Sequence, residues 1–398
     1  METRRPISLF SIQSLSPDMV TEWSGPFICR RLRQSMNVAS EWIVRSLIRA
    51  TLAVPDTWLV WWLKDRRQTY REQSLHPRIQ FGLELVERIG LPKQHRLSPP
   101  EARQHSKGFS DLLDIRKTQL PIVEDTTVPG PGGPIAVRVY RPTRSRERCP
   151  VVLFLHGGGF VLGDVEGYDH PCRKLAKSSK AVVVSVEYRL APEHPFPAGL
   201  EDCWAVFEWL RTQGETWDLD SEHITLAGDS AGGNLAAVIA QLARDAGGIQ
   251  PVLQVLIYPR VDSANMSTSA IELKDRNLVL TEELMTWFRE HYLQNEEDVR
   301  DFRLSPLLNP NLSDLPPAIV ITCGFDPLWD EAAAYADALE SQGVAVERIH
   351  MPDMIHGAWS LGGFLKSVRK LHRHVANQIK AAHKDELSLS PEVQAIAS

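Results

Sequence analysis

Gly228-Asp229-Ser230-Ala231-Gly232 decides the fold that we expect for this chain. An apolar run with strand character, residues 224–227, precedes it, and residues 233–240 have the composition of a buried helix. A serine at such a tight strand-to-helix turn needs glycine two positions to either side, because larger side chains would collide. The turn would hold the Ser230 hydroxyl at the carboxyl end of a sheet. The pentapeptide alone is weak evidence, since roughly one chain in seven of this length contains G-x-S-x-G by chance.

A second glycine-rich motif strengthens this interpretation. The apolar run 151–155 is followed by His156-Gly157-Gly158-Gly159-Phe160. Three glycines after a buried strand leave backbone N–H groups open to a ligand, as an oxyanion hole requires. A phosphate-binding loop is the alternative, but no lysine follows at P-loop spacing and no G-x-G-x-x-G pattern is present.

A serine hydroxyl becomes a good nucleophile only when a base takes its proton, and the base needs a third group to hold its tautomer. In an open α/β sheet these groups should follow the carboxyl ends of strands. Asp326 follows the apolar run 318–322, and His356 lies in the loop after the strand-like run 344–350. The resulting chain order of Ser, Asp and His is the order found in α/β hydrolases.

Other acids and histidines near these positions are weaker candidates. Asp330 falls on a predicted helix as a surface charge, Asp353 could cap a loop, and His350 lies within a strand. We expect Asp229 to hydrogen-bond nearby loop groups. We expect His156 to anchor the glycine loop and not to transfer a proton.

Length, net charge and cysteine content restrict the classes of protein to which this chain can belong. The 398 residues can bury a large core, and a net charge of -6 argues against a nucleic-acid partner. The five cysteines are scattered and form no C-x-x-C pair, so they predict neither a zinc site nor a disulfide framework. With no evident secretory signal, we expect an intracellular, cytoplasmic protein with reduced thiols.

Strands and helices alternate from about residue 120 onward. Eight strands, most of them joined by helices, predict a mostly parallel sheet covered by helices on both faces. We expect the strands at residues 122–128, 135–140, 151–155, 181–186, 223–227, 252–257, 318–322 and 344–350. The alternation stops at about 263–310, a polar stretch with one helix at about 281–293, which we interpret as a lid insertion. Residues 111–398 would form the catalytic domain.

Residues 1–110 are predicted to form an N-terminal helical extension or cap. Helical patterns at 36–52 and 57–70 are separated by Pro55. Charged residues interrupt every window long enough to cross a membrane. We favour cap helices over a pocket, and a helix lying on a membrane surface stays as the alternative. Four tryptophans could line that pocket, and an ordinary place in the core is an equally open alternative for each: Trp58, Trp61, Trp62 and Trp287.

Five motifs in this order resemble the hormone-sensitive-lipase family of α/β-hydrolase serine esterases. They lie at residues 156–160, 187–198 (EYRLAPEHPFPA), 228–232, 326–328 and 356–357. The resemblance covers about residues 120–380 and implies an α/β-hydrolase fold without a metal or an organic cofactor. It implies catalytic roles for Ser230, Asp326 and His356. It further implies an oxyanion hole formed by the backbone N–H groups of Gly158, Gly159 and Ala231.

These expectations describe a serine carboxylic-ester hydrolase for short- to medium-acyl or small natural-product esters. One alternative is a non-catalytic receptor for a small ligand, similar to gibberellin receptors, which keep the serine and lack the histidine. The presence of His356 argues against that alternative. Another is an acyltransferase or a dedicated biosynthetic deacetylase with the same triad. The sequence leaves the natural ester and the oligomeric state open.

Overall fold

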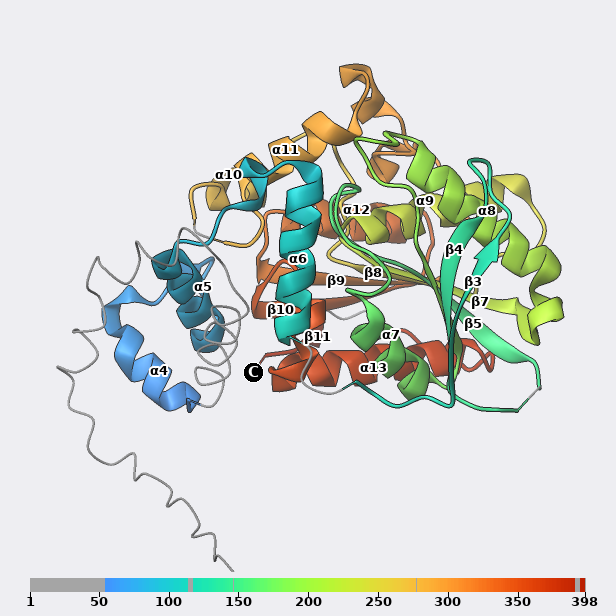
Figure 1. Ribbon diagram of the computed structural model, residues 1–398, viewed down its shortest axis with the longest axis horizontal. Helices are drawn as coiled ribbons and strands as arrows, with labels where there is room; N and C mark the ends of the chain where they lie inside the picture. Colours follow the sequence, from blue (N-terminus) through green and yellow to red (C-terminus); the bar gives the residue numbers. More distant parts are fainter. Residues whose placement is uncertain (1–53, 114–116, 146, 277, 391–393, 398) are drawn as a thin grey trace, which may run out of the picture.

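The computed structural model describes residues 54–113, 117–145, 147–276, 278–390 and 394–397. Within them, a nine-stranded sheet has the strand order β11-β10-β9-β8-β7-β5-β6-β4-β3 (Figure 1). The strands are β3 (Ile122–Val128), β4 (Ile135–Arg141), β5 (Cys149–Leu155), β6 (Val182–Val186), β7 (Leu219–Asp229), β8 (Leu253–Ile257), β9 (Ala318–Phe325), β10 (Val346–Ile355) and β11 (Gln394–Ala395). Only the pairs β3–β4 and β4–β6 are antiparallel among the neighbours in this sheet. The prediction of eight strands in a mostly parallel sheet is confirmed, and the two-residue strand β11 adds a ninth.

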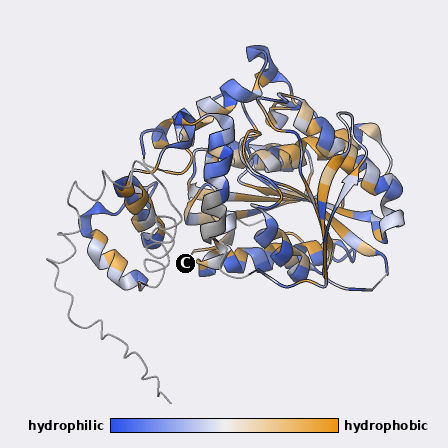
Figure 2. Cartoon of the chain, viewed as in Figure 1, coloured by the Kyte–Doolittle hydropathy of each residue, from blue (hydrophilic) through white to orange (hydrophobic). Residues whose placement is uncertain are grey.

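Helices cover both faces of the sheet, as predicted. On one face α8 (Ala198–Gln213), α9 (Ala231–Ala246) and α12 (Trp329–Ser341) pack over a large apolar core. On the other face α7 (Asp169–Ser179) and α13 (Lys366–Ala382) cover a second core. Every residue of β6, β8 and β9 is buried, because these central strands have a helical layer on each side. Figure 2 shows the same arrangement as apolar strands enclosed by helices of mixed polarity.

The described part of the N-terminal region holds α4 (Asp56–Leu63), a hairpin of β1 (Thr69–Tyr70) and β2 (Gln73–Ser74), α5 (Pro77–Ile89) and α6 (Pro99–Leu113). The predicted helix 57–70 therefore ends at Leu63. A 3-10 turn over Lys64–Arg66 follows, where the apolar run gives way to charged residues. The helix predicted at 36–52 lies outside the described residues. No helix in the described part of the chain is long and apolar enough to cross a membrane.

The described residues of the segment 263–310 form two α-helices, α10 (Thr268–Leu273) and α11 (Glu282–Tyr292), followed by two short 3-10 helices. The predicted helix at about 281–293 is therefore confirmed. It begins where the Thr281 side chain accepts a hydrogen bond from the N–H of Leu284, which satisfies a free donor of the first turn. In Figure 1, α10 and α11 lie above the sheet.

Candidate active site

The turn between β7 and α9 places Ser230 in a conformation that side chains rarely adopt. Its φ is 55° and its ψ is -118°. A Cβ atom on Gly228 would lie 2.3 Å from the carbonyl oxygen of Gly232. A Cβ atom on Gly232 would lie 1.9 Å from the carbonyl oxygen of Leu155. The close approach of three backbone segments is thus the physical reason for both glycines, as expected from the sequence.

Substituting Gly232 tests this steric requirement. We expect Gly232→Ala to lower the free energy of unfolding by more than about 4 kcal/mol, because the new methyl group overlaps a backbone that cannot move away. Gly82→Ala is the matched control. It lies inside α5, where the added Cβ would meet no atom within 4 Å apart from the neighbouring backbone of its own helix, and it should stabilise the helix by about 0.5–1 kcal/mol. Urea unfolding of both variants measures the difference. Equal stabilities of the two variants would contradict the account.

Three side chains from separate parts of the chain meet at the carboxyl edge of the sheet. The Oγ atom of Ser230 lies 2.8 Å from Nε2 of His356. Nδ1 of His356 lies 2.8 Å from Oδ2 of Asp326. Because an ionised carboxylate only accepts hydrogen bonds, the proton sits on Nδ1, which leaves Nε2 free to accept from the serine hydroxyl. Oδ1 of Asp326 accepts from the N–H of Leu328 at 2.9 Å, so both carboxylate oxygens have donors.

The sheet explains why these residues meet. Ser230 follows β7, Asp326 follows β9 and His356 follows β10, and these parallel strands lie close together in the sheet order. Asp326 is fully buried and His356 is almost fully buried, so water is largely excluded from their hydrogen bond. The Tyr258 ring, at the end of β8, packs 4.7 Å from the His356 ring and supports its orientation.

The loop after β5 brings backbone donors to the same place. Gly158 and Gly159 have φ values of 120° and 60°, which glycine adopts readily. The ring of Phe288 would lie 2.3 Å from a Cβ on Gly159, so the backbone of this loop is pressed against α11. Together with Ala231, the first residue of α9, both glycines line the cavity next to Ser230. Within the described residues, the N–H groups of Gly158, Gly159 and Ala231 donate to no protein acceptor.

The side chains of Asp229 and His156 hold the glycine loop, as expected. The Asp229 carboxylate accepts from the N–H of Gly157 at 2.9 Å and from the Tyr168 hydroxyl at 3.0 Å, and burial raises its pKa to about 6. His156 is fully buried, and its Nδ1 donates to the carbonyl of Gly157 at 2.8 Å. Burial lowers the pKa of His156 to about 4, so the ring is neutral near pH 7. Neither side chain bonds to Ser230.

The other acids and histidines lie outside the hydrogen-bond chain of Ser230. His350 bonds to Thr322 at 2.9 Å and stacks on Trp329. Asp330 is more than a surface charge, because it makes a bidentate ion pair with Arg71 and also accepts from the N–H of Ser269. This pair attaches the β1–β2 hairpin to the helix that follows Asp326.

A cavity of about 340 Å³ opens beside Ser230 and His356. Its apolar wall comes mainly from the loop after β5 and from residues 263–310, and it includes Phe160, Leu280, Met285, Phe288 and Tyr292. None of the four candidate tryptophans is among the residues that line the cavity. Trp58 and Trp61 are 68% and 61% exposed on α4, Trp62 packs against Phe81, and Trp287 of α11 is buried in the core.

Two residues of this site escaped the sequence analysis. Arg260 lines the cavity, and its guanidinium binds the buried carboxylate of Glu331. The sequence did offer a sign for Arg260, because this residue follows shortly after β8. The carboxyl end of β8 lies next to that of β7, the strand that leads to Ser230. Glu331 carried no such signal, because it lies within α12. Among the residues that the structure describes, no group of three His, Cys, Asp or Glu side chains is arranged to hold a metal ion.

Comparison with known proteins agrees with this geometry. The family model described as "alpha/beta hydrolase fold" matches residues 152–360. The chain belongs to this family, in its hormone-sensitive-lipase group. This α/β hydrolase is 42% identical to the carboxylic ester hydrolase LipN of Mycobacterium tuberculosis over 66% of the chain and 71% of that relative. It is 33% identical to the ethyl acetate hydrolase of Pseudomonas putida over 74% of the chain and 94% of that relative.

Solved structures support the same assignment. A hyperthermophilic esterase from the archaeon Pyrobaculum calidifontis superposes with a TM-score of 0.73 at 41% identity, over 77% of this α/β hydrolase and 98% of the esterase. An ester hydrolase from the metagenome of Lake Arreo, in complex with a bipyridine phosphonate derivative, gives a TM-score of 0.74 at 38% identity and the same coverage.

Proposed function

We propose that this α/β hydrolase is a serine carboxylesterase that acts through Ser230, Asp326 and His356. The observation that carries the proposal is the unbroken chain of two 2.8 Å hydrogen bonds from the serine hydroxyl through the imidazole to the buried carboxylate. The relatives named as ester hydrolases and esterases support the reaction class. A receptor on the same fold would not need an imidazole at hydrogen-bond distance from the serine.

The reaction would proceed in two halves. Nε2 of His356 takes the proton of Ser230 as Oγ attacks the ester carbonyl carbon. The imidazolium, held by Asp326, then gives that proton to the alcohol oxygen, the C–O bond breaks and the alcohol leaves. In the second half, His356 takes a proton from water, the resulting hydroxide attacks the acyl-enzyme, and Ser230 regains its proton as the acid leaves.

We assign the oxyanion hole to the N–H groups of Gly158, Gly159 and Ala231. In each tetrahedral intermediate the former carbonyl oxygen carries a negative charge, and preorganised donors stabilise that charge. Each such donor is worth on the order of 3 kcal/mol in the transition state. These three groups lie beside Ser230 and have no protein acceptor in the described part of the chain, which supports the assignment.

We further propose a cap made of the N-terminal region and residues 263–310. Gln94 and Ser106 from the N-terminal region line the cavity together with side chains of α11. Arg103 of α6 holds this region to the catalytic domain by donating to the carbonyls of Val161 and Ala191. Replacing Arg103 by alanine should therefore raise KM for esters more than it lowers kcat. An unchanged KM would contradict a cap role for α6.

The size of the cavity favours short- to medium-acyl esters. A volume of about 340 Å³ is at the lower end of small-molecule sites. We expect kcat/KM for p-nitrophenyl esters to be highest at chain lengths of about two to eight carbons and to fall steeply toward sixteen. A flat or rising profile would contradict an acyl site of this size.

Four free, buried cysteines within the described residues support our proposal of a cytoplasmic location, which cell fractionation would test.

A further inference from the structure

The cavity wall contains one cation that is fixed directly behind the nucleophile. Arg260 lies three residues after Ile257, the last residue of β8, and its backbone N–H donates to the carbonyl of Ser230 at 3.2 Å. Its own carbonyl accepts from the side-chain amide of Asn234 at 2.7 Å. The backbone of Arg260 is therefore hydrogen-bonded to the turn between β7 and α9 that carries Ser230, while its side chain lines the cavity.

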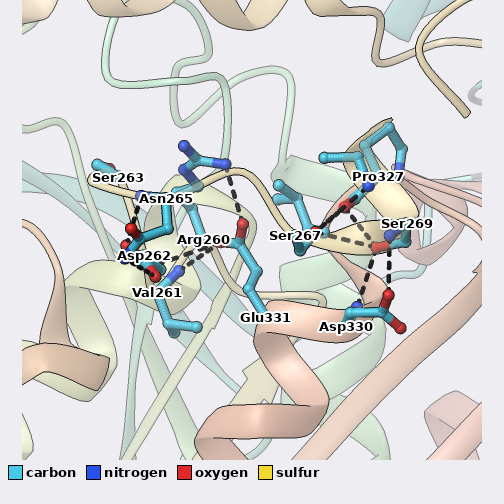
Figure 3. A network of polar contacts seen from close by, with 12 residues as sticks. Arg260, Val261, Asp262, Ser263, Asn265, Ser267, Ser269, Pro327, Asp330 and Glu331 are labelled. Atoms are coloured by element: carbon cyan, nitrogen blue, oxygen red, sulfur yellow. Dashed lines mark hydrogen bonds and ion pairs between the residues drawn. The ribbon is translucent and has the colours of Figure 1, made fainter. Parts of the chain in front are cut away.

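The guanidinium of Arg260 is held from one side only. Nη1 donates to Oε2 of Glu331 at 3.0 Å, and Oε1 of Glu331 accepts from the N–H of Val261 at 2.8 Å. Figure 3 shows one guanidinium nitrogen of Arg260 directed at Glu331, while its other nitrogen atoms have no partner among the residues drawn. In the described part of the chain, Nε and Nη2 of Arg260 donate no hydrogen bond. The Arg260 side chain is 26% exposed, whereas that of Glu331 is 2% exposed.

Several charged groups lie around this cation. Glu331 is its ion-pair partner, and burial raises the pKa of that carboxyl to about 7. The two oxygens of Asp229 already accept from Gly157 and Tyr168. On α11, Arg289 is paired with Glu296, and Glu282 lines the cavity as an acid. Arg260 is thus a fixed cation with spare donors in a mostly apolar wall beside the nucleophile.

We propose that Arg260 binds a carboxylate group of the substrate, so that the preferred esters carry a second, ionised carboxyl group. This inference rests on the proposed esterase function and names its substrate class. A guanidinium that is already oriented by a buried acid can donate to a carboxylate with two parallel hydrogen bonds. An uncharged ester offers these donors no charged acceptor, and this difference would produce selectivity.

Two matched pairs of esters test the proposal on both sides of the scissile bond. The first pair compares mono-p-nitrophenyl adipate with p-nitrophenyl adipamate, so that a terminal carboxylate replaces an amide on the acyl side. The second pair compares 4-acetoxybenzoate with 4-acetoxybenzamide, which makes the same change on the alcohol side. In at least one pair we expect the carboxylate ester to have a kcat/KM that is about 10- to 100-fold higher.

Variants of Arg260 identify the source of that selectivity. We expect Arg260→Met to reduce the carboxylate-to-amide ratio of kcat/KM to about one, chiefly through KM, and Arg260→Lys to retain part of it. The double variant Arg260→Met/Glu331→Gln removes both charges together and should show the same lost ratio without a buried unpaired acid. Circular dichroism checks that each variant is folded.

The possible outcomes separate this inference from the esterase proposal. A wild-type enzyme that hydrolyses both members of each pair at equal kcat/KM would overturn the role of Arg260 and leave the esterase function standing. Selectivity that persists in folded Arg260→Met would overturn it as well. Hydrolysis of none of the four esters, together with no activity on the p-nitrophenyl series, would overturn the proposed function itself.

Discussion

Ser230→Ala is expected to lower kcat for ester hydrolysis on the order of 10⁵-fold, without unfolding the protein. The variant removes the atom that forms the acyl-enzyme, and His356 then has no hydroxyl to deprotonate. The fold should survive, because the Ser230 side chain bonds only to His356, and alanine has the same backbone preferences as serine at this turn. Initial rates with p-nitrophenyl butyrate, measured above the spontaneous background, give the factor.

A control for Ser230→Ala comes from the same cavity. Ser263 also lines the cavity, and its backbone N–H donates to the Oγ of Ser305 at 2.8 Å. Ser263→Ala should therefore retain kcat within about threefold, because a surface hydroxyl without a reacting partner contributes little to a transition state. Activity that survives in Ser230→Ala but falls in Ser263→Ala would refute the assignment of the nucleophile.

Asp326→Asn is expected to lower kcat by about 10⁴-fold. Both oxygens of Asp326 are acceptors, one for Nδ1–H of His356 and one for the N–H of Leu328. An asparagine offers one oxygen and one NH₂ group, so in either orientation a donor faces a donor. The imidazole would then shift to the tautomer with its proton on Nε2, which cannot accept from Ser230.

Asp330→Asn is the matched control for Asp326→Asn. It lies four residues later, and its carboxylate binds Arg71 and the N–H of Ser269. We expect this variant to lose some stability through the weakened hairpin contact and to keep kcat within a few-fold. Equal losses of kcat in both variants would show that the region is sensitive to any change, and would contradict the special role of Asp326.

Most of the fold could be predicted because its determinants are local. The runs 151–155 and 318–321 are apolar without interruption, as strands covered on both faces must be, and they lie within β5 and β9. Residues 228 and 232 are glycines because the backbone segments at a tight strand-to-helix turn around a serine come too close for a side chain. The three side chains that meet at Ser230 follow strand ends, and the parallel sheet brings strand ends together.

The errors arose where distant contacts determine the structure. The predicted strand 344–350 continues as β10 to Ile355, through Pro352 and a register shift that sequence patterns treat as a strand end. The predicted helix 57–70 ends early because residues 69–74 turn back as a hairpin, with Arg71 and Glu72 at positive φ. The partner that holds this hairpin, Asp330, lies 259 residues from Arg71 in the chain.

The cavity lining was the least predictable part of the site. Aromatic residues suggested an apolar pocket, but Trp58 and Trp61 are exposed on α4, and the aromatic side chains that line the cavity are Phe160, Phe288 and Tyr292. Which face of a lid helix turns toward the catalytic domain depends on packing that no local pattern encodes. Arg260 could be placed near Ser230 from its strand, but its partner Glu331 could not.

Labelling with diethyl p-nitrophenyl phosphate, followed by peptide mass spectrometry, tests the central claim most directly. An activated serine attacks the phosphorus, and p-nitrophenol leaves. We predict one diethylphosphoryl group per chain, on the peptide that contains Ser230, with loss of esterase activity in proportion to labelling. His356→Asn should label far more slowly, and Ser230→Ala should not label. A label on any other residue, or full activity in labelled protein, would contradict the account.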